Sequence, residues 1–339
     1  RIVVALKKLK KKGIKMKKIL SYFAGAIIGL SLSVSTAKAD CGDVSVGAMG
    51  WASGESIAAV AKFVLEVGYG CKVKIVPTDT VPAVTSLAEN GKPDIVPEVW
   101  NNSAPAYGKL VAAGKVITAS SVFANGGEEG WWIPTSLAEK HPELKTIKGI
   151  LANPKKVGSR FHNCPTGWGC RLVNDNLKIV HDLEKNGIKV FDHGSGANLT
   201  ASIGAAFADN EPWFGYYWGP TAVLGKYKMT KVDIGPIDKK QHTINQKKGA
   251  DRSKIGASGF PSAPVLNAIT ADFAKRQPEV AAFIGKMTYP NDVLSSLLAW
   301  KEAKKASADE AAAWVLTNHK DMVLSWVNAE ARAKLKKKL

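Results

Sequence analysis

Residues 44–76 have the sequence VSVGAMGWASGESIAAVAKFVLEVGYGCKVKIV, and this stretch decides the fold. Valine and isoleucine are concentrated over 44–47 and again over 73–76, as is typical of strands bounded by glycine. Between them, residues 56–66 place apolar side chains at helical spacing. A strand, a helix and a second strand in this order predict two parallel strands joined by a helix.

The same alternation continues along the chain. Further helices are predicted at 81–89, 104–113, 174–186 and 199–209, and further strands at 95–99, 156–159, 190–191 and 214–218. This pattern predicts the α/β class, with mostly parallel sheets flanked by helices on both faces. From residue 270 to residue 337 the pattern changes to helices separated by Pro278, Pro290 and short polar turns.

Two irregular stretches, 122–130 and 235–264, are rich in Gly, Pro or polar residues. A chain that leaves one lobe, builds a second and returns needs two such crossings. We therefore predict a first lobe from 40–133 and 258–339, and a second lobe from 134–257. A mature chain of about 300 residues is long enough for two lobes.

Residues 1–39 have the pattern of an export signal. Met16-Lys17-Lys18 opens a basic stretch, residues 19–34 form an apolar run, and Ala37-Lys38-Ala39 provides an A-x-A cleavage site. That order predicts a secretory signal peptide, with residues 1–15 as an upstream extension and a periplasmic mature protein. A retained membrane anchor is the alternative, but the run is short for a membrane span.

The net charge of +18 overstates the basic character of the mature chain. Residues 1–39 hold Arg1 and nine lysines with no acid, so +10 of the charge lies there and +8 on the rest. Part of that remainder lies in the tail, from Arg332 to Lys338. No basic stripe on a recognised module is present, so we expect no nucleic-acid partner.

The four cysteines predict two disulfides, because an even number in an exported protein favours bridges. Cys164 and Cys170 bracket a Pro- and Gly-rich turn that can bring them within bridging range. Cys41 and Cys71 stand just before two predicted strands that would lie side by side. Free buried thiols are the alternative. The C-x5-C spacing has no paired C-x-x-C, so we expect no metal, and nothing indicates a cofactor.

No catalytic motif is found. The nucleophile elbow, the zincin helix, the Walker loop and the dinucleotide fingerprint are all missing from the sequence. His162 and His193 could meet in space, but a lone hydrogen-bonded histidine is the more common case. We predict that the protein is not an enzyme.

Tryptophan is the informative residue, because six of the ten lie where strands end or loops begin. These are Trp51, Trp100, Trp131, Trp132, Trp168 and Trp218. In open α/β sheets, ligands bind beyond the carboxyl ends of the strands. Indole faces attract a quaternary ammonium by cation–π and apolar contact together, worth about 2 kcal/mol when desolvated. Ordinary core packing is the alternative for each ring.

Three motifs carry a family resemblance: Gly-Trp-Gly between Cys164 and Cys170, Tyr-Tyr-Trp-Gly-Pro at 216–220, and Pro-Asp-Ile-Val-Pro-Glu-Val-Trp at 93–100. Residues 40–339 resemble the glycine-betaine and proline-betaine binding proteins of ABC importers. The resemblance implies a type II periplasmic-binding-protein fold whose two lobes close on a ligand in the cleft between them.

The resemblance also implies roles for single residues. Trp100, Trp168 and Trp218 match the family's three-indole cage around a trimethylammonium group. The backbone N–H groups of Gly169 and Cys170 match the donors that hold the ligand carboxylate, as successive N–H groups in a tight turn can.

Additional residues set this sequence apart from the simplest three-indole pattern. Trp51, one of Trp131 and Trp132, and Glu129 resemble additions in the trimethylamine N-oxide and choline branches. The expected function is capture of glycine betaine or trimethylamine N-oxide by a monomer that delivers it to a membrane permease. Alternatives are choline, proline betaine, dimethylsulfoniopropionate or an amino acid in the same fold, and, more remotely, an exported enzyme.

Overall fold

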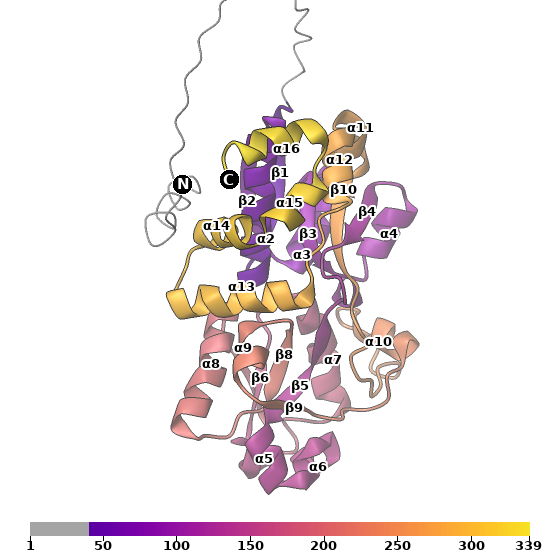
Figure 1. The fold of residues 1–339 in the computed structure, drawn as a ribbon. Helices are drawn as coiled ribbons and strands as arrows, with labels where there is room; N and C mark the ends of the chain where they lie inside the picture. Colours follow the sequence, from indigo (N-terminus) through magenta and orange to yellow (C-terminus); the bar gives the residue numbers. More distant parts are fainter. Residues whose placement is uncertain (1–40) are drawn as a thin grey trace, which may run out of the picture.

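The computed structural model describes residues 41–339, so the predicted signal peptide at 1–39 lies outside the described residues. The chain forms two lobes, one above the other in Figure 1, each built around a five-stranded sheet. The first sheet has the order β2-β1-β3-β10-β4, and its strands are β1 (Asp43–Met49), β2 (Lys72–Thr78), β3 (Ile95–Trp100), β4 (Val116–Ser121) and β10 (Val265–Thr270). The second has the order β7-β6-β8-β5-β9, and its strands are β5 (Glu128–Pro134), β6 (Arg160–Asn163), β7 (Lys189–Asp192), β8 (Gly215–Gly219) and β9 (Met229–Lys231).

The two sheets have the same plan. In each, four strands point the same way and the fourth strand in the order, β10 or β5, runs against them. Both opposed strands directly follow a crossing from the other lobe, which explains their reversed direction. The predicted α/β class with mostly parallel strands is confirmed.

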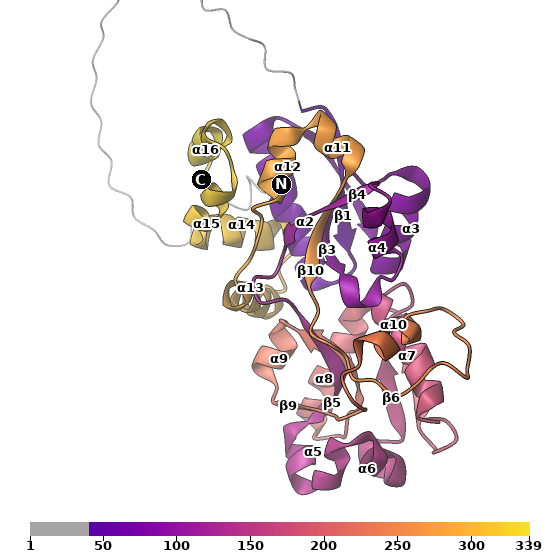
Figure 2. The same ribbon diagram turned by 90° about the vertical axis from the view of Figure 1, so that its right-hand side faces the viewer.

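Helices cover both faces of the sheets, as Figures 1 and 2 show. Those of the first lobe before the crossing are α2 (Ala52–Val64), continued by a π-helical turn at Leu65–Tyr69, α3 (Thr80–Asn90), the 3-10 turn Asn101–Ser103 and α4 (Tyr107–Ala112). Those of the second lobe are α5 (Thr135–Lys140), α6 (Ile147–Ala152), α7 (Gly169–Val180), α8 (Gly196–Asp209), α9 (Ala222–Lys226) and α10 (Lys239–Asn245), with 3-10 turns at Pro142–Lys145 and Pro154–Val157.

The C-terminal helices return to the first lobe. They are α11 (Ala271–Arg276), α12 (Pro278–Ile284), α13 (Asn291–Lys304), α14 (Ala308–Asn318), α15 (Lys320–Trp326) and α16 (Ala329–Lys336). Helix α14 packs on α2, and α13 lies between the lobes, where it contacts α9. Within residues 41–339 no helix combines the length and apolarity that a bilayer crossing requires.

Several strands differ from the sequence prediction. The strand expected at 156–159 is wrong, because Pro154 begins a 3-10 turn and the strand starts only at Arg160. Strands β4, β5, β9 and β10 were not predicted. The expected lobe edge at 133/134 falls at the end of β5, a strand that pairs with β8 and β9 of the second sheet. Because all of β5 belongs to the second sheet, the chain passes from the first lobe to the second before residue 128.

The two crossing segments run side by side. Gly127 and Ala263 form an antiparallel bridge, with the Gly127 N–H donating to the Ala263 carbonyl at 2.7 Å and the reverse bond at 2.9 Å. Both predicted disulfides are present. Cys41–Cys71 joins the starts of the paired strands β1 and β2, and Cys164–Cys170 closes the turn between β6 and α7.

Candidate functional site

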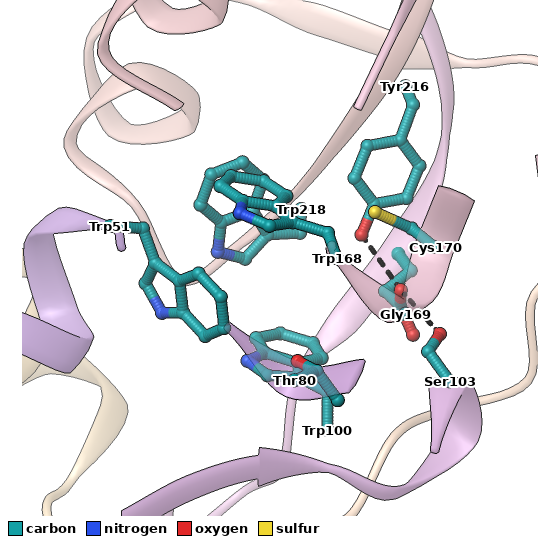
Figure 3. A pocket seen from close by; sticks show the side chains of 10 residues that line it. Trp51, Thr80, Trp100, Ser103, Trp168, Gly169, Cys170, Tyr216 and Trp218 are labelled. Atoms are coloured by element: carbon teal, nitrogen blue, oxygen red, sulfur yellow. Dashed lines mark hydrogen bonds between the residues drawn. The ribbon is translucent and has the colours of Figure 1, made fainter. Parts of the chain in front are cut away.

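A cavity lies between the lobes at the ends of β1, β3 and β8 (Figure 3). Its empty space, including the opening to solvent, is about 270 Å³. Side chains of both lobes line it: Trp51, Thr80, Trp100, Ser103, Glu129, Trp168, Gly169, Cys170, Tyr216 and Trp218. Five of these ten residues are aromatic, so a ligand here would meet aromatic rings on several sides.

Three of the indoles pack edge to face. The ring centroids of Trp51 and Trp168 are 5.1 Å apart at an interplanar angle of 74°, and those of Trp168 and Trp218 are 4.9 Å apart at 88°. Such pairs fix each ring's direction. Trp100 lies across the cavity from Trp218 (Figure 3) and packs its edge on Phe123 at 5.9 Å.

The lobes contribute equally to this group of rings. Trp51 follows β1 and Trp100 ends β3, both in the first lobe. Trp168 precedes α7 and Trp218 lies in β8, both in the second lobe. The contact between Trp51 and Trp168 therefore joins the lobes, and the Val81 N–H adds a bond to the Gly167 carbonyl at 3.1 Å.

The turn before α7 presents backbone N–H groups to the cavity. Gly167 has a φ of +97°, a conformation that favours glycine, and the Cys164–Cys170 bridge closes the turn. Helix α7 begins at Gly169, so the N–H groups of Gly169 and Cys170 lie in its first turn and have no intrahelical acceptor. At Gly169 any side chain would collide with Ser103, since its Cβ would lie 2.1 Å from the Ser103 carbonyl oxygen. This position combines close lobe contact with an anion-attracting helix start.

Glu129 adds a buried carboxyl group beside that turn. Its Oε1 accepts hydrogen bonds from the Tyr216 hydroxyl at 2.8 Å and the Ser103 hydroxyl at 3.3 Å. Its Oε2 has no hydrogen-bond partner among the described residues. Burial raises the pKa of Glu129 to about 7, against the lowering effect of Tyr216, Ser103 and Lys231. Near neutral pH the group can therefore either accept or donate a proton at the cavity.

The structure brings seven of the nine predicted ligand-binding residues to one cavity: Trp51, Trp100, Trp168, Trp218, Gly169, Cys170 and Glu129. Their contact with a ligand stays a prediction. Trp131 and Trp132 do not line the cavity.

Strand β5 explains where these two rings lie. Trp131 is fully buried in the second lobe, where it packs on Phe161 at 4.4 Å and donates to Asn174. Trp132 points to the other side of the strand, where its indole N–H donates to the Tyr217 carbonyl. The Lys231 ammonium lies over the Trp132 ring, 5.7 Å from the ring centroid. Adjacent residues of a strand face opposite ways, and neither side of β5 at this position opens to the cavity.

Sequence reasoning missed Thr80, Ser103 and Tyr216 as lining residues, and Glu98 and Asp79 behind them. Tyr216 stands in the motif that contains Trp218, two residues away and on the same face of β8, which is a usable signal. Burial raises the pKa of Asp79, while hydrogen bonds from the Gly50 N–H and the Trp168 indole lower it. Because Gly50 belongs to the first lobe and Trp168 to the second, Asp79 lies at the contact between the lobes. His162 and His193 do meet, at 2.8 Å, but neither lines the cavity.

The chain matches the OpuAC family, described as the substrate binding domain of ABC-type glycine betaine transport systems, over residues 42–318. A search of curated protein sequences finds no match. The fold is also similar to solved structures of low sequence identity, which by themselves show the fold alone.

One is the glycine betaine/L-proline-binding protein ProX from Borrelia burgdorferi, with 16% identity, 86% of this chain and 99% of that chain covered, and a TM-score of 0.70. A second is an ABC-transporter choline binding protein in complex with choline, with 20% identity, 88% and 98% covered, and a TM-score of 0.69. A third is lactococcal OpuAC in a closed form with glycine betaine, with 18% identity, 84% and 99% covered, and a TM-score of 0.65.

Proposed function

The chain belongs to the family of substrate-binding domains of ABC-type glycine betaine transport systems, and we propose that it captures a small methylated ammonium osmolyte, glycine betaine or trimethylamine N-oxide, in its four-indole cage. The observation that carries this proposal is the convergence of Trp51, Trp100, Trp168 and Trp218 on one cavity. As an exported, periplasmic monomer it would pass its ligand to a membrane permease.

The cage suits a cation that has no N–H to donate. The positive charge of a quaternary ammonium is spread over methyl groups, so ring faces hold it better than hydrogen-bond acceptors do. The carboxylate of a betaine, a short distance from its ammonium, would accept hydrogen bonds from the backbone N–H groups of Gly169 and Cys170. Both contacts are matched to the two ends of such a ligand.

Ligand binding would also close the lobes. Two indoles come from each lobe, so all four can surround a cation only when the lobes are together. A ligand that binds the closed form better shifts the population toward it. We place the hinge at the paired crossings through Gly127 and Ala263, the only described segments that pass between the sheets.

A specific observation disfavours amino-acid binding, which needs a charged clamp. Arg160 and Arg171 are arginines of the second lobe that could serve as such a clamp, but both are engaged elsewhere. Arg171 pairs with Asp175 and Asp192, and Arg160 lies over the Phe191 ring at 5.0 Å. Neither lines the cavity.

Glu129 is the residue we propose to decide between the two osmolytes. An N-oxide oxygen can share a proton with a carboxyl group, whereas a betaine carboxylate is served by the turn at Gly169. We expect Glu129→Ala to weaken trimethylamine N-oxide binding at least tenfold and to change glycine betaine binding by less than threefold. A tenfold loss is about 1.4 kcal/mol, close to the lower end of the range for one hydrogen bond to a charged group. Titration calorimetry of both ligands on both proteins measures this, and equal losses would show that Glu129 is only structural.

A thermal-shift screen tests the class of ligand. Glycine betaine, trimethylamine N-oxide, choline, proline betaine and dimethylsulfoniopropionate are compared with proline and arginine, at concentrations from micromolar to millimolar. A ligand that binds only the folded state raises the melting temperature with its concentration. We expect at least one methylated cation to do so without being consumed, and a response to the amino acids alone would contradict the proposal.

A further inference from the structure

A second buried carboxyl group lies behind the cage. The Glu98 side chain, in β3, has no exposed surface and is not part of the cavity lining. Its Oε1 accepts hydrogen bonds from the Trp51 indole N–H at 2.5 Å and the Trp100 indole N–H at 3.3 Å. The Ser53 hydroxyl donates to the same oxygen at 2.7 Å. Figure 3 shows the indole nitrogens of Trp51 and Trp100 on the same side of the cage.

The backbone is distorted to place this group. Glu98 has a φ of +63°, a conformation that a side chain other than glycine adopts at a cost. The pairing of β3 with β10 shifts there, because Leu266 lies opposite Val99 and Ala268 opposite Val96. Pro97 and Glu98 of β3 therefore both lie opposite the single residue Asn267 of β10. This is a β-bulge, a feature that can redirect a side chain. An ordinary strand residue would not need this geometry.

Glu98 has no counter-charge within residues 41–339, since its surroundings contribute hydrogen bonds and burial but no Lys or Arg. Its Oε2 has no hydrogen-bond partner there, nor has the nearby Tyr289 hydroxyl, whose pKa is raised by burial and by Glu98 itself. A buried carboxyl group is normally paired or fully hydrogen-bonded. Glu98 is neither, which points to a charge supplied from outside the protein.

We propose that Glu98 is a positioning and specificity-determining residue: it orients Trp51 and Trp100, and it gives the cage its preference for a cation over a neutral ligand of the same shape. This inference rests on the proposed function. A carboxylate that accepts from two indoles polarises them, and its charge acts on the cavity through a low-dielectric interior.

Burial raises the pKa of Glu98 to about 7, against the three donors that lower it. A bound cation and the ionised form of Glu98 would therefore stabilise each other, as linkage requires. Trp51 and Trp100, both of the first lobe, are the rings through which this coupling acts.

The test compares ligands that differ in charge but not in shape. Choline is paired with 3,3-dimethylbutan-1-ol, and glycine betaine with 3,3-dimethylbutanoate, in which carbon replaces the ammonium nitrogen. Dissociation constants are measured by calorimetry or competition at one pH. The variants are Glu98→Gln, which keeps shape, Glu98→Asp, which keeps charge, and Glu55→Gln, which removes an exposed acid of α2 whose partner is Lys301 at 3.6 Å.

We expect E98Q to lower the cation preference, the ratio of the two dissociation constants within a pair, at least tenfold. E98D should weaken both members of a pair while keeping their ratio within about threefold, and E55Q should change neither, tenfold being about 1.4 kcal/mol. If E98Q does not fold, E98D decides alone, because equal affinity to wild type would exclude a positioning role. Cation binding with unchanged preference in E98Q overturns this inference only, whereas wild-type protein that binds neither cation overturns the proposed function as well.

Discussion

Trp51 and Trp100, on the first-lobe side of the cage, are tied by hydrogen bonds to the buried carboxyl group of Glu98. On the second-lobe side the Trp168 indole also interacts with an acid, but this is Asp79 of the first lobe, which is only partly buried. Trp168 is held by a disulfide-closed turn, and Trp218 packs on Tyr217 at 4.5 Å and on Trp168 at 4.9 Å. One half of the cage thus shares a fully buried carboxyl group, whereas the other relies mainly on covalent closure and ring packing, so different perturbations should affect them.

Removal of single rings should give the largest effects. Trp100→Ala, Trp168→Ala and Trp218→Ala should each weaken binding of the preferred ligand at least tenfold, because about 1.4 kcal/mol is a conservative share of one cation–π contact with its apolar burial. Trp168 should show the largest loss, since it contacts rings of both lobes.

Trp300→Ala is the matched control for these ring variants. Trp300 stacks on Trp314 in the C-terminal helices at 5.9 Å and is not part of the cavity. Calorimetry should give it wild-type affinity. Near-native affinity in two of the three cage variants would contradict the cage.

The two disulfides should separate affinity from stability. Replacing Cys164 and Cys170 by Ser should weaken binding about fivefold, since fivefold is about 1 kcal/mol and the turn carries Trp168 and the two N–H donors. With a sequence separation of 6 its chain-entropy contribution is small, about 2 kcal/mol.

The double variant Cys41→Ser, Cys71→Ser should show the opposite pattern, a loss of stability without a loss of affinity. Its sequence separation is 30 and it lies at the far end of β1, so it should cost about 3.5 kcal/mol of unfolding free energy and leave affinity unchanged. Denaturant titration and calorimetry on both variants measure the two quantities. Unchanged affinity with a badly unfolded protein for the Cys164 and Cys170 pair would mean that this bridge acts only as a staple.

A smaller effect concerns pH. Burial raises the pKa of Glu129 to about 7 in the folded protein, above its ordinary value of 4.5, so the folded state binds more protons between these values. The unfolding free energy contributed by Glu129 must therefore fall as pH rises through that window. Wild-type protein should lose stability relative to Glu129→Gln between about pH 4.5 and pH 7.

The comparison with the variant is needed because buried histidines act in the opposite direction. The pKa of His162 is lowered to about 3 and that of His242 is also lowered, in both cases chiefly by burial. These contributions are common to both proteins and cancel in the difference. A difference in unfolding free energy that does not change with pH would contradict the buried state of Glu129.

Sequence patterns predicted the parts of this molecule in which local signals agree with the fold. Alternation of strands and helices predicted the parallel strands, and the Pro- and Gly-rich turn predicted its own disulfide. The strands that were missed follow lobe crossings or lie at sheet edges. In β4 and β5 serine, threonine, glycine and glutamate stand where an apolar run would be expected.

The site was predictable where a ring stands at a strand end and not where the backbone departs from regularity. Trp100 and Trp218 end strands, so their place followed from topology. Glu98 precedes Trp100 by two residues in a strand and would share its face, but the bulge and its positive φ change the direction of its side chain. Such a bulge depends on the pairing partner β10, which lies more than 150 residues away in the chain.

The most direct test of the account is a crystal structure of the protein with glycine betaine bound. We predict the ammonium nitrogen within about 6 Å of the ring centroids of Trp51, Trp100, Trp168 and Trp218, the range of cation–π contacts. The ligand carboxylate should accept from the Gly169 and Cys170 N–H groups. A ligand held outside this cavity, or with its ammonium against Asp79 or Glu129 and fewer than two indoles, would contradict the central claim.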